Sequence, residues 1–150
     1  MNNNQVENIE MEKIRQYFET KDKLGRHLGI KLLEVGKGFA KVKMQISEPH
    51  LNGIGTVHGG TIFTLADVAF AAASNSHGTI AVAVNVSISF LKAACQGVLY
   101  AEAREVSRNP KLANYDVRVT DGDEHLIAVF QGLAYRKKDK LLEENRNRPE

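Results

Sequence analysis

Cysteine and tryptophan are almost absent from this 150-residue chain, which has one of the first and none of the second. The single cysteine, Cys95, excludes an internal disulfide, a two-cysteine redox motif and a zinc site built on cysteine pairs. We interpret Cys95 as a small buried hydrophobic residue rather than a nucleophile.

Long apolar runs are also missing. No window approaches the roughly 18 consecutive apolar residues of a membrane-spanning helix, and the first residues, "MNNNQVENIEMEKIRQ", are polar where a signal peptide would be apolar. The net charge of +2 is too small to indicate nucleic acid or a membrane surface as partner. We therefore expect one cytoplasmic domain with neither of these partners.

Helical periodicity is present near the N-terminus, from about Val6 to Leu24, where apolar residues recur among charges. The sequence then predicts a hairpin that turns at Gly36 to Gly38, and a turn-rich loop, "SEPHLNGIGT", leads into the next element. The apolar positions of the first helix are Ile9, Met11, Ile14, Tyr17 and Phe18.

A second helix is predicted from His58 to about Asn75, and it is apolar nearly all round, as expected for a helix enclosed by other structure. Four β-type segments follow it, with turns at Gly97, Arg108 to Lys111 and Asp121 to Asp123. The pattern predicts an α+β fold, in which a curved antiparallel sheet of five to six strands wraps one long buried helix. We divide the chain into an N-terminal helix (1–26), the main domain (27–137) and a charged tail (138–150).

Asp67 interrupts the apolar helix. At about 100° per residue it shares a polar sector with three hydroxyl residues, and large and small apolar residues occupy the opposite face. The sector either faces solvent or holds a partly desolvated carboxylate that acts as base or nucleophile. The polar residues are Thr61, Thr64, Asp67 and Ser74, and the apolar residues are Phe63, Ala66, Phe70 and Ala73.

The start of this helix is rich in glycine. Gly59 and Gly60 leave the first-turn amides unobstructed, so a carbonyl oxygen could approach them as in an oxyanion site. A tight turn or close packing explains a glycine pair equally well. His58 can be a cap or an acid–base group, and Asn52 can be a turn residue or part of a site.

Helix length sets a condition on any shared site. Gly59 and Asp67 are eight positions apart, about 12 Å along a helix that rises ~1.5 Å per residue. One acyl carbon cannot touch both within one chain. A common reaction therefore requires a two-fold dimer, with Asp67 supplied by a second, antiparallel copy of the helix.

The stretch "NGIGTVHGGTIFTLADVAFAAASNSHG", Asn52 to Gly78, closely resembles the signature of the PaaI-type acyl-CoA thioesterases, which have the hotdog fold. The resemblance extends more loosely through "SISFLKAACQG". It implies a hotdog domain that hydrolyses an acyl- or aryl-acyl-CoA to a free acid and CoA. Phenylacetyl-CoA is a possible substrate, and no metal or cofactor is needed.

The resemblance also implies roles for four residues. Asp67 would be the catalytic carboxylate, acting as base on water or as nucleophile through a mixed anhydride. The Gly59 amide would polarise the thioester carbonyl, Asn52 would position water or the carboxylate, and His58 would fix the loop. The last three would come from the subunit opposite Asp67, in a homodimer that can pair into a tetramer.

Contacts to the rest of the substrate are also expected. Gly60, Phe63 and Phe90 are our candidates for the acyl site, and Lys92, Arg108 and Lys111 for the CoA phosphates. The segment "KAACQGV" departs from the family, where proline and a Gly-Asp pair are usual. Two alternatives remain: a non-catalytic acyl-CoA binding domain, and a hydroxyacyl dehydratase, which would need a histidine base beside an acidic residue.

Overall fold

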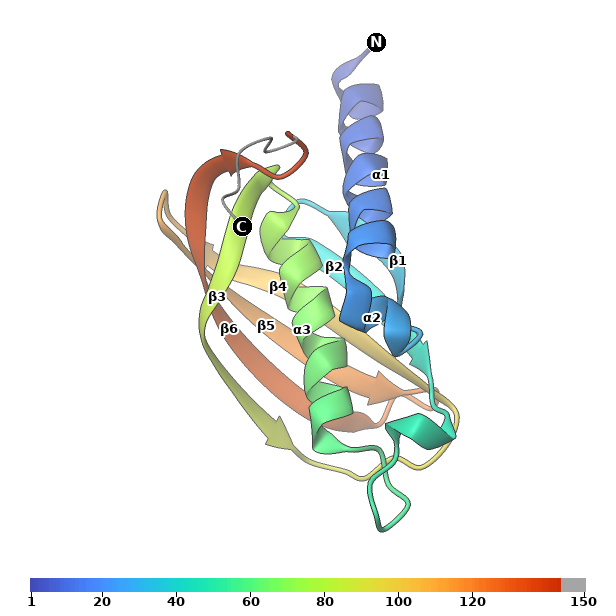
Figure 1. Cartoon of the computed structure of the whole chain (residues 1–150). Coiled ribbons are helices and arrows are strands. Elements are labelled where there is room, and N and C mark those ends of the chain that lie inside the picture. The colour runs from blue at the N-terminus through green and yellow to red at the C-terminus, as the bar shows by residue number, and fades with distance from the viewer. Residues whose placement is uncertain (144–150) are drawn as a thin grey trace, which may run out of the picture.

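The computed structural model describes residues 1–143 (Figure 1). Two helices precede the sheet, α1 (Asn3–Lys21) and α2 (Lys23–His27). They are followed by β1 (Lys31–Gly36), β2 (Phe39–Gln45), the 3₁₀ helix η1 (Glu48–His50) and α3 (Gly59–Asn75). The last four elements are β3 (Thr79–Phe90), β4 (Val98–Arg108), β5 (Leu112–Asp121) and β6 (Leu126–Lys140).

The six strands form one antiparallel sheet in the order β1-β2-β4-β5-β6-β3. β3 is therefore an edge strand, although it follows α3 directly in the chain. The sheet curves around α3, which lies in its concave face (Figure 1). The predicted α+β hotdog architecture is confirmed.

The core lies between α3 and the sheet because α3 presents small and aromatic side chains to the strands. Phe70 is 1% exposed, and its ring meets those of Tyr115 and Phe130 at centroid distances of 5.6 and 5.7 Å. Phe63 packs edge-on against Phe130 at 5.6 Å. A Cβ on Gly132 would lie 2.7 Å from the Phe70 ring, so the strand must carry glycine there for the helix to pack this closely.

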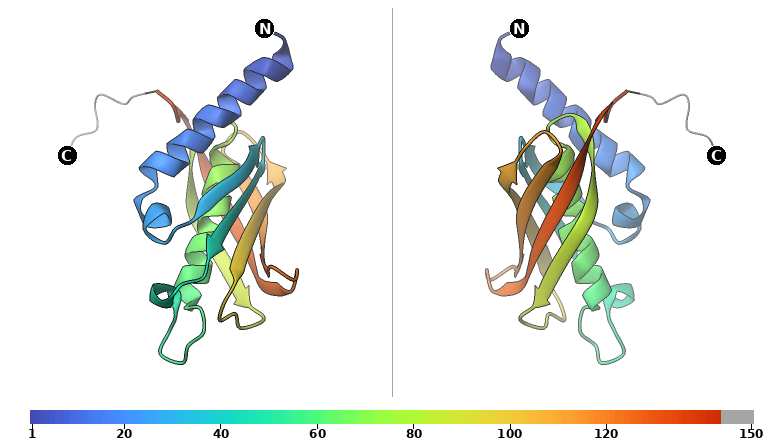
Figure 2. Two further views of the ribbon diagram at one scale, coloured as in Figure 1. Left: turned by 90° about the vertical axis from the view of Figure 1, so that its right-hand side faces the viewer. Right: turned by 90° about the vertical axis from the view of Figure 1, so that its left-hand side faces the viewer.

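The N-terminal region is two helices rather than the single one predicted, because Asp22 ends α1 and caps α2. α1 packs on the domain through Met11 and Ile14, which form a small cluster with Leu141 near the end of β6. Its first turns project beyond the sheet (Figure 2). Ile9, expected on the apolar face, is 43% exposed.

Two further sequence expectations need correction. Cys95 is exposed rather than buried, because it lies in the loop between β3 and β4. β6 continues to Lys140 and Leu141 is buried, so the sheet extends past the expected boundary at residue 137. The remainder of the predicted tail, from residue 144, lies outside the described residues. No helix in the described part of the chain is long and apolar enough to cross a membrane.

Candidate active site

Asp67 is the only charged residue of α3, and its side chain is partly buried. Burial, and then the negative charge of Asp22, raise the pKa of the Asp67 carboxyl above its ordinary value of 3.8. The ends of the predicted polar sector, Thr61 and Ser74, are 8% and 4% exposed. The sector is therefore not a solvated surface, and Asp67 is partly desolvated within a single chain.

The first turn of α3 leaves one amide open. Among its four amides, Gly60 donates to Nδ1 of the capping His58 at 2.8 Å, and Thr61 and Ile62 donate to the His58 carbonyl oxygen at 2.9 and 3.1 Å. Within the described residues the Gly59 amide has no hydrogen-bond acceptor. Because helix N-termini carry partial positive charge, this amide is the one available to a ligand's carbonyl oxygen.

His58 and Asn52 shape the loop in front of the helix. The His58 amide donates to the His50 carbonyl oxygen at 2.8 Å, so His58 fixes the loop as well as capping α3. The Asn52 Oδ1 accepts from the amides of Ile54 and Thr56 at 3.1 Å, and its Nδ2 donates to the Thr56 hydroxyl at 2.8 Å. In this structure the Asn52 side chain is engaged within its own loop.

The side chain of Phe90, at the end of β3, contacts the start of α3. A Cβ placed on Gly59 would lie 3.2 Å from the Phe90 ring, so the ring rests against the Gly59 backbone. Phe90 is nevertheless 53% exposed, and Lys92, two residues further on, is exposed too. The structure thus brings two predicted site residues, Phe90 and Gly59, together at the start of α3.

The other two predicted phosphate contacts lie at the opposite end of α3. Arg108 ends β4, and its Nη1 lies 2.7 Å from Nδ1 of His77, which follows the last turn of α3. Its Nε is 3.6 Å from Oε1 of Glu105. Lys111 lies in the same β4–β5 turn. The two ends of α3, Gly59 and Asn75, are about 24 Å apart at ~1.5 Å per residue.

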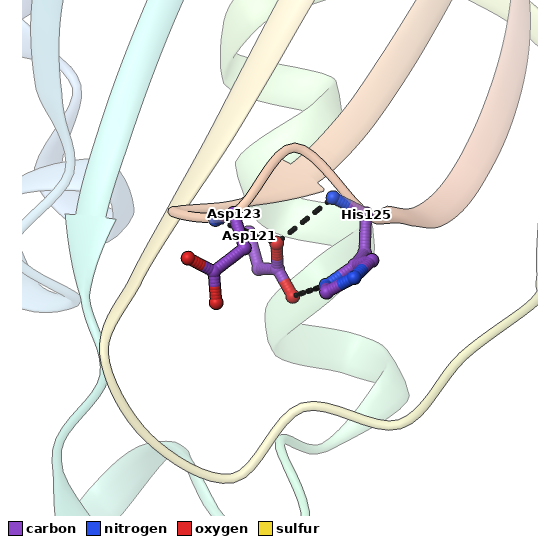
Figure 3. Close-up of side chains that lie close together, drawn as sticks. All are labelled: Asp121, Asp123 and His125. Carbon is purple, nitrogen blue, oxygen red and sulfur yellow. Dashed lines mark hydrogen bonds and ion pairs between the residues drawn. The ribbon is translucent and has the colours of Figure 1, made fainter.

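Three potential metal ligands meet at the turn between β5 and β6, where Asp121, Asp123 and His125 lie close together (Figure 3). His125 Nδ1 is 3.0 Å from Oδ2 of Asp121, and Oδ1 accepts from the amides of Asp123 and His125 at 2.9 Å. These bonds account for the arrangement as a tight turn, and we assign no metal to it.

Comparisons with known proteins bear on the family of this chain. A family model described as the thioesterase superfamily matches residues 54–128. The acyl-coenzyme A thioesterase PaaI of Escherichia coli is 36% identical over 77% of this chain and 83% of its own length. This chain belongs to the PaaI-type branch of the thioesterase superfamily.

Other relatives of this PaaI-type protein cover a similar part of it. A putative esterase of Archaeoglobus fulgidus is 46% identical over 84% of this chain and 82% of its own length. The solved structure of the E. coli PaaI protein from the phenylacetic acid degradation operon has a TM-score of 0.84 at 31% identity. The match covers 87% of this chain and 96% of the E. coli chain. The fold, the helix and its glycine-rich start therefore belong to a thioester hydrolase.

Sequence reasoning missed one group beside the PaaI-type site, Asp22. Its side chain accepts from the Gly25 amide at 3.0 Å, and its charge acts on Asp67 from a different helix. A signal for its local role existed, since an aspartate before a short helical stretch is a typical N-cap. Nothing in the pattern indicated that it lies near Asp67.

Proposed function

We propose that this protein hydrolyses the thioester of an acyl-CoA to a carboxylic acid and coenzyme A. The observation that carries this proposal is the open Gly59 amide at the start of a helix whose only charge is the partly desolvated Asp67. Thioester hydrolysis needs both an oxyanion donor and a base or nucleophile. The printed activity of the E. coli relative, an acyl-coenzyme A thioesterase, supports the same reaction.

The chemistry follows from these two groups. The Gly59 amide binds the carbonyl oxygen and stabilises the negative charge that develops on it. Asp67 takes a proton from water while the water oxygen bonds to the acyl carbon; the C–S bond then breaks, and the thiolate receives the proton. In the alternative route the Asp67 carboxylate itself attacks the acyl carbon, and the C–S bond breaks to release the CoA thiolate. Water then hydrolyses the mixed anhydride to the free acid and the Asp67 carboxylate, and the proton that water gives up goes to the thiolate. In either route Asn52 positions the water molecule, after its side chain gives up its hydrogen bonds within its own loop.

We further propose that the site is shared in a two-fold dimer. The separation of about 12 Å between Gly59 and Asp67 along one helix requires a second chain. β3 offers the contact, because it is a long edge strand with exposed apolar side chains, and such edges pair with other chains. Val82 and Val84 are 40% and 55% exposed on it. Pairing two β3 strands around a two-fold axis sets the two α3 helices antiparallel.

The acyl group, the phosphate contacts and the cellular compartment are further proposals. We propose that Phe63 and Phe90 contact an aromatic acyl group such as phenylacetyl, supported by the packing of Phe90 against the Gly59 backbone. Lys92 stands nearest Gly59 among the cations proposed for the CoA phosphates, and Arg108 and Lys111 remain candidates for a more distant phosphate. We propose the cytoplasm as its compartment, in keeping with a chain that has one cysteine.

Thiol release from a panel of acyl-CoAs, including phenylacetyl-CoA, tests the reaction. Asp67→Asn should lower kcat roughly 10²- to 10⁴-fold, because general base catalysis contributes about that much. Equal rates in wild type and mutant would remove Asp67 from the mechanism. Binding of acyl-CoA without thiol release by wild type would instead identify a non-catalytic binding domain.

Subunit mixing tests the shared site. Heterodimers of Asp67→Asn and Gly59→Pro chains contain one site with both native groups, so they should recover part of the wild-type activity. No recovery despite demonstrated subunit exchange would contradict the dimer arrangement.

A further inference from the structure

A histidine just after the C-terminal end of α3 has both of its ring nitrogens against charged groups of β4. His77 lies two residues beyond α3, and its side chain is only 10% exposed. Its Nε2 lies 2.6 Å from Oε2 of Glu105, and its Nδ1 lies 2.7 Å from Nη1 of Arg108. The imidazole ring is therefore held from both sides by one strand.

These partners decide which ring nitrogen of His77 carries the proton. A guanidinium can only donate, so Nδ1 accepts from Arg108 and carries no proton. Burial opposes ionisation of Glu105, but hydrogen bonds from Tyr115 and His77, with nearby positive charge, lower the pKa of its carboxyl. Glu105 Oε2 thus accepts from Nε2, as it does from the Tyr115 hydroxyl at 2.8 Å. His77 is neutral in this arrangement, with its proton on Nε2.

Charged groups from two other elements face the same region. A hollow beside His77 is lined by Glu10 of α1, Lys140 at the end of β6, and Glu143. Lys140 Nζ lies 3.2 Å from Oε1 of Glu143, so these two charges largely offset each other. Within the described residues, the His77 ring nitrogens form their hydrogen bonds with Glu105 and Arg108 alone. The two β4 side chains therefore dominate the response of His77 to a proton.

We propose that the contact between His77 and Arg108 is a proton-operated latch between the end of α3 and β4, closed at neutral pH and opened by acid. Histidine ordinarily titrates at about pH 6.5, within reach of mild acidification. A proton on Nδ1 places two donors 2.7 Å apart and sets an imidazolium against a guanidinium. Arg108, whose side chain is already 40% exposed, then turns into solvent, while His77 keeps its bond to Glu105 as a charged pair.

Long-range proton–nitrogen NMR of the imidazole ring observes the protonation step, with His77→Gln providing the assignment. At pH 8 the proton should lie on Nε2 alone, and Nδ1 should gain a proton as the pH falls toward 5. In Arg108→Met the midpoint should move to higher pH, because the opposing charge and the donor to Nδ1 are gone. A proton on Nδ1 at pH 8, or an unchanged midpoint in Arg108→Met, would overturn the proposal.

Urea denaturation observes the opening of the latch. Arg108→Met should lower the denaturation midpoint at pH 8, where the latch is closed, and leave it unchanged at pH 5. The side chain in His77→Gln can donate to Glu105 and accept from Arg108 but gains no proton in this range. In that background Arg108→Met should have the same effect at both pH values. Equal losses at pH 8 and pH 5 in the native background would overturn the proposal.

Arg104→Met is the matched control, because Arg104 lies on the same strand and pairs with a carboxylate, Glu102, at 2.6 Å without a histidine. Its effect on the urea midpoint should be the same at pH 8 and pH 5. A pH dependence equal to that of Arg108→Met would indicate a general effect of charge and contradict the latch. None of these readouts depends on thiol release, so the latch stands or falls independently of the proposed function.

Discussion

The two ends of α3 are built in opposite ways. At the N-terminal end the Gly59 amide has no acceptor within the described residues, and Phe90 and Lys92 beside it are exposed. At the C-terminal end the side chains of Asn75, Ser76 and His77 all form hydrogen bonds within the chain. The N-terminal end of α3 is therefore open to a ligand, whereas the C-terminal end stabilises the fold.

The C-terminal end shows how complete this bonding is. Asn75 is 5% exposed, and its amide group binds the Ala71 carbonyl oxygen at 2.9 Å and both backbone groups of Ala81 at 2.9 and 3.2 Å. Glu105 Oε2 receives the Tyr115 hydroxyl at 2.8 Å and lies 2.6 Å from Nε2 of His77. These bonds join α3 to β3, β4 and β5.

Asp67, at the middle of α3, and Glu105, at its C-terminal end, titrate in opposite directions. Burial raises the pKa of Asp67. Desolvation acts in the same sense on Glu105, but hydrogen bonds from Tyr115 and His77 and the charges of His77 and Arg108 lower the pKa of Glu105 below its ordinary 4.5. Ionisation of Asp67 therefore lowers the stability of the fold, whereas ionisation of Glu105, at the C-terminal end of α3, raises it.

Among changes at the two ends of α3, removing the open donor should have the largest effect. Gly59→Pro deletes the amide hydrogen, and proline fits the first position of a helix, where His58 before it already has φ −57° and ψ 135°. We expect kcat to fall roughly 10²- to 10³-fold, as when one oxyanion donor is lost. Gly59→Ala is the control, because it adds a similar Cβ against Phe90 and keeps the amide. Similar losses in both variants would show that crowding, not the donor, matters.

At the C-terminal end of α3, a substitution should lower the stability of the fold rather than the catalytic rate. Asn75→Ala leaves the half-buried backbone groups of Ala81 without their Asn75 partners, and we expect about 2 kcal/mol lower unfolding free energy. kcat/KM per folded molecule should stay at the wild-type value. Urea denaturation and thiol release at matched folded fractions measure the two quantities. A large loss of kcat/KM would connect this end to the chemistry.

The opposite titrations predict opposite pH effects on stability. Because the folded-state pKa of Asp67 is raised, its penalty is absent below the ordinary 3.8 and grows as pH rises through the folded value, so Asp67→Asn should be more stable than wild type at neutral pH only. Because that of Glu105 is lowered, its contribution is present above the ordinary 4.5 and lost as pH falls through the folded value. Glu105→Gln should therefore lose stability at neutral pH and converge with wild type in acid. Denaturant midpoints across pH 2 to 8 check both, and parallel curves for wild type and mutants would contradict them.

Charge removal on the surface should have the smallest effect. Lys92→Ala is expected to raise KM for an acyl-CoA by roughly two- to fivefold at low salt, corresponding to about 0.5–1 kcal/mol for an exposed ion pair. The increase should diminish at high salt. Lys111→Ala, at the far end of α3, is the comparison. A larger rise in KM for Lys111→Ala would indicate that the phosphate contacts lie at the C-terminal end of α3.

Local patterns predicted much of the fold. The helical period located α3 to within one residue, and it separated Asp67 from the face that carries Phe70, because both features depend on neighbours within a few turns. The glycine pair indicated an open first turn. Which of its amides is open depends on the orientation of the His58 ring, which no periodicity contains.

Long-range contacts explain what the sequence did not reveal. Asp22 comes beside α3, and His77 meets Glu105, only after separate elements pack. The end of β6 was assigned to a charged tail because Lys138, Asp139 and Lys140 are charged, although they belong to the strand beside β3. Cys95 was assigned to the interior by residue type alone, and a loop residue need not follow that tendency.

The small cluster of Met11, Ile14 and Leu141 joins the beginning and the end of the described chain. Contacts between such distant positions close a very long loop, which is entropically costly until the intervening sheet has formed. We therefore expect α1 to dock after the sheet has closed around α3. The same order in reverse makes α1 the first element to detach under stress, and with it the Asp22 joint that borders the catalytic helix.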